Sequence, residues 1–104
     1  MTENLLDPLE VAGNVYKLKM ENDRVRVFDV TFHPGDKAVM HQHPDHVVYV
    51  LEGGKMKLTS GGKTDILDLI DGDAIFLTAQ SHEAENIWQS TLELLVVELK
   101  SNIK

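Results

Sequence analysis

The chain has 104 residues, which is enough for one domain and too few for two. Its formal net charge of −7 argues against non-specific nucleic-acid binding, which depends on Lys and Arg contacts to phosphate, and against docking on an anionic membrane. The absence of cysteine excludes disulfides and thiolate metal sites. Residues 1–13 lack the pattern of a signal peptide, and no stretch reaches the roughly 20 apolar residues of a spanning helix. We expect a soluble cytoplasmic protein.

The predicted elements, in chain order, are short apolar runs separated by turn signals, which is the pattern of an all-β protein. Residues 4–11 offer at best one turn of helix, because Pro8 interrupts them, and residues 15–20 partly alternate like a strand. Turns with Gly and Pro separate the runs that follow. We predict strands over 25–32, 38–43, 46–51, 55–59, 64–70, 74–78, 81–87 and 92–99. Strands of this length and spacing suggest a sandwich or a barrel.

Three of the five histidines, His41, His43 and His46, fall within six residues. Successive side chains on a strand point to opposite faces, so His41 and His43 share a face and can chelate one ion. His46 follows a short turn, which favours antiparallel neighbouring strands with His46 beside the pair. His82 lies in a distant segment that a barrel can bring close. Neutral imidazoles suit Zn, Cu, Fe and Ni. The alternative, from spacing alone, is three separate surface histidines in a loop.

The run from Pro34 to His43 resembles the first motif of the cupins, a Gly and five residues followed by His-x-His, and the run from Tyr49 to Gly53 resembles its end. Gly72-Asp73, followed by His82 and then Asn86, resembles the second motif. The resemblance covers residues 24–99. It implies a double-stranded β-helix, a jelly-roll-like barrel, with a metal inside. The ligands that it implies are His41, His43 and His82.

Two positions depart from the cupin pattern. The family usually places a Glu ligand seven residues before the glycine that matches Gly53, and this chain has His46 there. A neutral nitrogen in place of an anionic oxygen leaves the site more positive. Thr78 stands where the second motif usually has Pro, which is a loop change. The prediction is one divalent metal ion (Zn, Fe, Ni, Cu or Mn) bound by His41, His43, His46 and His82.

Other residues have a structural and a functional interpretation. Asn86 shares a strand face with His82, so it either orients a ligand imidazole or is a strand-end asparagine. Arg26 either anchors a substrate carboxylate through a bidentate pair or has a purely structural role. The structural role is favoured by its strand face, which is not clearly polar. We expect Tyr49 and Trp88 to pack, and His33 to be exposed.

The inner wall beside the metal is predicted to be small and apolar, because strand alternation turns Val39, Val48 and Val50 inward with the histidines. Carboxylates cluster in the turns, so we expect none in the interior, and the catalytic residues stay unknown. The resemblance implies either a dioxygenase- or isomerase-like enzyme or a non-catalytic ligand-binding or sensing module. In either case the ligand would be a small oxygenated organic molecule rather than a polyanion.

Residues 1–23 lie outside the motif region and form, in this interpretation, an N-terminal arm to a cupin barrel domain of residues 24–104. A strand over residues 15–20 needs a sheet edge, either in its own barrel or in a partner's. Cupins that resemble this chain are commonly homodimers, and most soluble oligomers are symmetric dimers. We therefore predict a two-fold homodimer that uses the arm and one barrel face.

Overall fold

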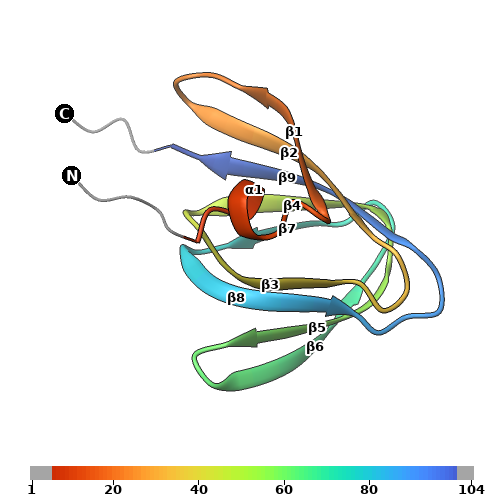
Figure 1. Ribbon diagram of the computed structural model, residues 1–104. Helices are drawn as coiled ribbons and strands as arrows, with labels where there is room; N and C mark the ends of the chain where they lie inside the picture. The colour runs from red at the N-terminus through yellow and green to blue at the C-terminus, as the bar shows by residue number, and fades with distance from the viewer. Residues whose placement is uncertain (1–5, 101–104) are drawn as a thin grey trace.

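The computed structural model describes residues 6–100 as two antiparallel β-sheets and one turn of helix (Figure 1). Within this range, no helix is long and apolar enough to cross a membrane. The elements are α1 Pro8–Val11, β1 Tyr16–Glu21, β2 Val25–Phe32, β3 Lys37–His43, β4 His46–Glu52, β5 Gly54–Ser60, β6 Lys63–Leu69, β7 Ala74–Leu77, β8 Gln80–Asn86 and β9 Leu92–Leu99.

The two sheets enclose one core. The five-stranded sheet has the order β1-β2-β9-β4-β7, and the four-stranded sheet has the order β3-β8-β5-β6. In Figure 1 the hairpin β5-β6 closes the second sheet at the bottom, and β1-β2 lies at the top of the first. Strand β9 shows the governing pattern, since every second residue from Leu92 to Glu98 is buried. The predicted all-β, double-stranded β-helix is confirmed.

The strands predicted from residue 25 onward are all present, with ends that agree to within one residue. The alternating segment at residues 15–20 is β1, and it pairs antiparallel with β2 of its own barrel. Asp7 caps the N-terminus of the single helical turn, since its Oδ1 accepts a hydrogen bond of 3.0 Å from the backbone N–H of Leu9. Pro8 fits the first helical position, because its missing N–H would have no helical partner there.

One expected strand pairing is wrong. Strands β3 and β4 are not neighbours, since β3 pairs with β8 while β4 pairs with β7 and β9 in the other sheet. The link Pro44-Asp45 carries the chain across the barrel instead of folding it back as a hairpin. His46 therefore approaches His43 from the opposite wall.

The expected inward direction of Val39 is also wrong. The register of β3 against β8 shifts between Ala38 and His41, which marks a β-bulge or similar irregularity. Ala38 and His41 are both fully buried, whereas Val39 is 49% exposed. An irregularity of this kind breaks the two-residue period, so simple alternation counted back from His41 fails at this position.

Candidate metal centre

Strands from both sheets place four histidines inside the barrel. His41 and His43 lie on β3, His82 lies on β8, and His46 begins β4. His41 stands directly opposite His82 in the β3–β8 register. All four side chains are buried, with exposed fractions of 0% for His41, 2% for His43, 1% for His46 and 3% for His82. Buried imidazoles need partners for both ring nitrogens, so the contacts of each nitrogen indicate what the site can bind.

One ring nitrogen of each histidine already has a protein partner. The Nδ1 contacts are His41 to Val39 O (2.6 Å), His43 to Glu98 Oε2 (2.6 Å), His46 to Pro44 O (2.7 Å) and His82 to Gln80 Oε1 (2.8 Å). All four partners are oxygen acceptors, so each neutral ring carries its proton on Nδ1. The Nε2 lone pairs are left for other partners, which is the arrangement that metal-ligating histidines adopt.

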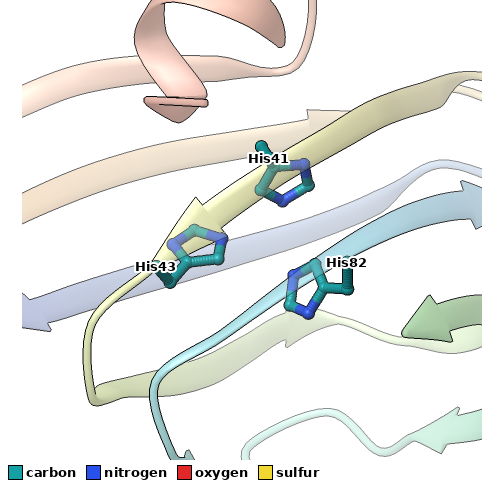
Figure 2. A group of neighbouring side chains, drawn as sticks. All are labelled: His41, His43 and His82. Carbon is teal, nitrogen blue, oxygen red and sulfur yellow. The ribbon is translucent and has the colours of Figure 1, made fainter. Parts of the chain in front are cut away.

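His41, His43 and His82 form a histidine triad. Each offers a ring nitrogen, and these nitrogens lie within 4.8 Å of one another. Figure 2 shows the three rings gathered between β3 and β8. An ion with imidazole bonds of about 2.0–2.1 Å fits this set after small side-chain rotations. The structure thus assembles a buried triad that could hold a metal.

His46 lies beside the triad without belonging to that closest set of nitrogens. Its ring stacks on His43, with centroids 4.4 Å apart and an interplanar angle of 28°. The centroid of His82 is farther away, at 6.3 Å. A fourth ligand at His46 therefore stays a prediction.

Burial keeps the histidines neutral. Burial, together with the neighbouring His41, lowers the pKa of His82 to about 3. Burial likewise lowers the pKa of His41, His43 and His46 from the ordinary value. Since a histidine must be unprotonated to bind a cation, the rings are held in their binding form near neutral pH.

The metal-free protein should lose stability as pH falls below about 6.5. The histidine pKa values are lower in the folded chain than in the unfolded chain, so the unfolded chain binds more protons below this pH. The free energy of unfolding therefore falls with pH through this window. Urea midpoints with chelator at pH about 7.5 and about 5.5 measure the effect, and both values lie above the ordinary pKa of solvated carboxylates, about 4. Equal midpoints would contradict the prediction.

A buried carboxylate lies behind the triad, contrary to the expectation that the interior holds none. Glu98 is 2% exposed, and its Oε1 accepts hydrogen bonds from Arg26 Nε and Nη2 at 3.1 and 3.0 Å. Arg26 also donates to both carboxylate oxygens of Asp7, at 3.1 Å each. Burial raises the pKa of Glu98, and Arg26 opposes this rise. The alternation of β9 was the available signal, since Glu98 follows Leu94 and Val96 on the inner face.

Arg26 and Asn86 have structural roles. Both edges of the Arg26 guanidinium are paired with protein carboxylates, so the interpretation as a substrate anchor is wrong. Asn86 donates to the carbonyls of Phe32 and Ser90 and accepts from the N–H of Trp88, which fixes the end of β8 rather than a ligand imidazole.

The remaining candidates, His33, Trp88 and Tyr49, do not line the cavity beside the histidines. His33 is exposed as expected, with Nδ1 3.3 Å from Thr91 Oγ1. Trp88 packs against the core. Tyr49 instead lies on the outside of β4 and is 40% exposed.

Tyr16 is a site residue that the sequence motifs did not indicate. It is 6% exposed, and its hydroxyl lies 3.1 Å from His43 Nε2 and 3.3 Å from His41 Nε2. Burial raises the pKa of Tyr16, so the phenol is neutral and donates to one of these nitrogens. Only the alternation of residues 15–20 offered a signal for its inward direction.

An apolar cavity adjoins the histidines between the two sheets. The centres of water-sized molecules can occupy about 40 Å³ of it, which is room for a few waters or one small ligand. Tyr16, His43, His46 and His82 contribute to its wall. The apolar part of the wall, expected in character, includes Val48, Met56, Leu67, Ile75, Leu77 and Val96.

The fold and the buried histidines define a class of protein, a double-stranded β-helix with a candidate metal site inside. The family model described as "Cupin domain" matches residues 28–98, so the chain belongs to the cupin family. No curated protein matches the chain.

Several solved structures share the fold. A cupin domain from Bordetella pertussis is 22% identical, with a TM-score of 0.79 over 84% of this chain and 93% of that one. A double-stranded β-helix protein from Klebsiella pneumoniae is 21% identical, with a TM-score of 0.69 over 86% and 79%. An RmlC-like cupin from Methanocaldococcus jannaschii is 18% identical, with a TM-score of 0.66 over 82% and 78%. At these identities the likeness shows the fold alone.

Proposed function

We propose that the protein binds one divalent metal ion and uses it to bind a small oxygenated organic molecule, as a dioxygenase- or isomerase-like enzyme. One observation carries the proposal: four buried imidazoles each have Nδ1 fixed by an oxygen acceptor, and three of them offer ring nitrogens within 4.8 Å of one another. In this proposal the ligands are His41, His43, His46 and His82.

The donor set favours particular ions. Neutral nitrogens without thiolates suit Zn, Cu, Fe and Ni better than the hard ions that prefer oxygen, and Mn stays among the candidates. The bound ion would supply Lewis-acid or oxygen-activating chemistry. The chain itself supplies a largely apolar wall, and His43 is held in its ligating tautomer by Glu98.

The cavity restricts the ligand. Its wall has no Lys or Arg among residues 6–100, so a nucleotide or a phosphorylated sugar would find no cationic partner there except the ion. A diketone, an enol or a hydroxy acid could bind the ion through one or two oxygens while its carbon skeleton contacts the apolar wall.

A non-catalytic ligand-binding module is the second candidate. It is favoured by the composition of the cavity wall, which holds no carboxylate among the described residues. The buried carboxylate of Glu98 is already paired with Arg26 and His43. Elemental analysis of purified protein tests the shared part of both proposals. Oxygen uptake with small diketones, phenols and thiols then separates them, since thermal stabilisation by such compounds without turnover would favour the binding module. A cytoplasmic location stays a prediction.

Homodimer formation is proposed through the outer face of the five-stranded sheet. One cross-strand row on that face is apolar throughout, in the order Met20, Val27, Val97, Val47 and Phe76. Met20 and Phe76 are 44% and 55% exposed. The outer face of the four-stranded sheet instead carries ion pairs, including Lys37–Glu83 and Lys57–Glu85. An apolar band that crosses a whole sheet is typical of a surface that another chain covers.

The substitution Phe76→Glu should convert the protein to a monomer. It places a charge at one end of the proposed apolar row, and the two-fold symmetry of an isologous contact would bury two copies of this charge in the interface. Light scattering should give twice 11.7 kDa for the wild type and 11.7 kDa for the variant. Ile66→Glu, at a residue 51% exposed on the other sheet, is the matched control and should stay dimeric. A monomeric wild type at micromolar concentration would end the proposal.

A further inference from the structure

Tyr16 comes from outside the part of the chain that the family model matches, which is residues 28–98. It lies on β1, is buried against Phe28 in an edge-on ring contact of 5.5 Å, and lines the cavity. Its hydroxyl nevertheless contacts two nitrogens of the histidine triad, on His41 and His43. The N-terminal strand thus adds a polar group to the site.

The hydrogen bonds of Tyr16 are incompatible with a loaded site. Among residues 6–100 its hydroxyl has no hydrogen-bond partners other than the Nε2 atoms of His41 and His43. Both nitrogens are acceptors, because each ring has its proton on Nδ1. An ion held by these nitrogens takes up both lone pairs. The O–H then needs another acceptor, since a buried hydroxyl without a partner is unfavourable.

The surroundings leave one place for that acceptor. The cavity wall is otherwise aliphatic or aromatic apart from His43, His46 and His82, whose Nδ1 protons are already bound to protein oxygens. Tyr16 is therefore the only donor left on the described wall. The nearest new acceptor would be an oxygen that binds the ion from the cavity side.

We propose that the Tyr16 hydroxyl donates a hydrogen bond to an oxygen of the exogenous ligand at the metal, and so selects anionic oxygen ligands. The inference rests on the proposed metal function. Hydrogen bonds to charged acceptors are stronger than those to neutral ones, so a carboxylate or an enolate gains more from Tyr16 than a neutral ligand does. Tyr16 acts here as a specificity residue that orients the ligand, and the metal is held without it.

The test uses Tyr16→Phe, which removes only the hydroxyl. Wild type and variant are loaded with Co²⁺, whose affinity is measured by competition with a chelator. Each is then titrated with acetate, an anionic oxygen ligand, and with imidazole, a nitrogen ligand that offers no acceptor once bound. Acetate affinity should fall about tenfold or more in the variant, while Co²⁺ affinity and imidazole affinity change less than about threefold. Tyr49→Phe, on the outer face, should resemble the wild type throughout.

The other outcomes overturn the inference in distinguishable ways. Equal acetate affinities in wild type and Tyr16→Phe would show that the hydroxyl does not reach the ligand. A loss of Co²⁺ binding in the variant would make Tyr16 part of the metal set instead. If wild-type protein bound no Co²⁺ and contained no other metal, the proposed function itself would fail, and this inference with it.

Discussion

Replacing His82 with alanine should lower metal affinity at least a hundredfold, a larger loss than the 10–100-fold cost of removing an outer partner of a ligand. His82 supplies one of the three mutually close nitrogens, and no other described side chain on β8 can replace it. Equilibrium dialysis with Zn²⁺ at neutral pH, followed by elemental analysis, measures the change. His33→Ala is the matched control, because His33 is exposed at a turn outside the site.

The same measurement on His46→Ala decides the size of the ligand set. A loss comparable to that of His82→Ala would support four histidine ligands. A much smaller loss would leave a three-histidine site of His41, His43 and His82. Wild-type affinity in His82→Ala itself would contradict the whole metal proposal, since the triad cannot hold the ion equally well with two nitrogens.

Replacing Arg26 with methionine should destabilise the fold by about 3–5 kcal/mol, because it leaves the charge of Glu98 buried without its partner. For a chain of this size that corresponds to a fall in Tm of about 15–30 °C. Thermal unfolding followed by circular dichroism measures the effect. Arg24→Met, at an exposed arginine two residues away, should change stability by less than about 0.5 kcal/mol.

A second variant separates the lost charge pair from lost packing of the long Arg26 side chain. In the double variant Arg26→Met with Glu98→Gln, no buried charge remains, so much of the stability should return. Equal melting temperatures for Arg26→Met and Arg24→Met would contradict the proposed role of the pair.

Strand positions and burial could largely be predicted from the sequence, because they follow from a two-residue period and from turn residues. That period places His41 and His43 on one face and turns Val48 and Val50 inward, as the structure has them. It does not say which sheet a strand joins. The pairing of β3 with β8 and of β4 with β9 depends on contacts far apart in the sequence, so the position of His46 could not be derived.

The missed residues share a physical reason. Glu98 and Tyr16 belong to no recognisable sequence motif. Each becomes a site residue only because a strand distant in the sequence places a histidine next to it. A carboxylate near a strand end is ordinarily solvated, and Glu98 is buried because Arg26, on the neighbouring strand, pairs with it. The predicted inward direction of Val39 is wrong for a local reason, since an irregularity such as a β-bulge changes the alternation within a single strand.

The hydrogen-bonded series from Asp7 through Arg26 and Glu98 to His43 joins the start of α1 to a ligand of the proposed ion. Asp7 is also the residue whose oxygens hold the amides of Leu9 and Val11. Thermodynamic reciprocity then applies: if the seated helix turn strengthens metal binding, metal binding must stabilise the helix turn by the same free energy. Metal binding should therefore slow hydrogen exchange at the backbone amides of Val11 and Ala12, at the other end of this series of hydrogen bonds.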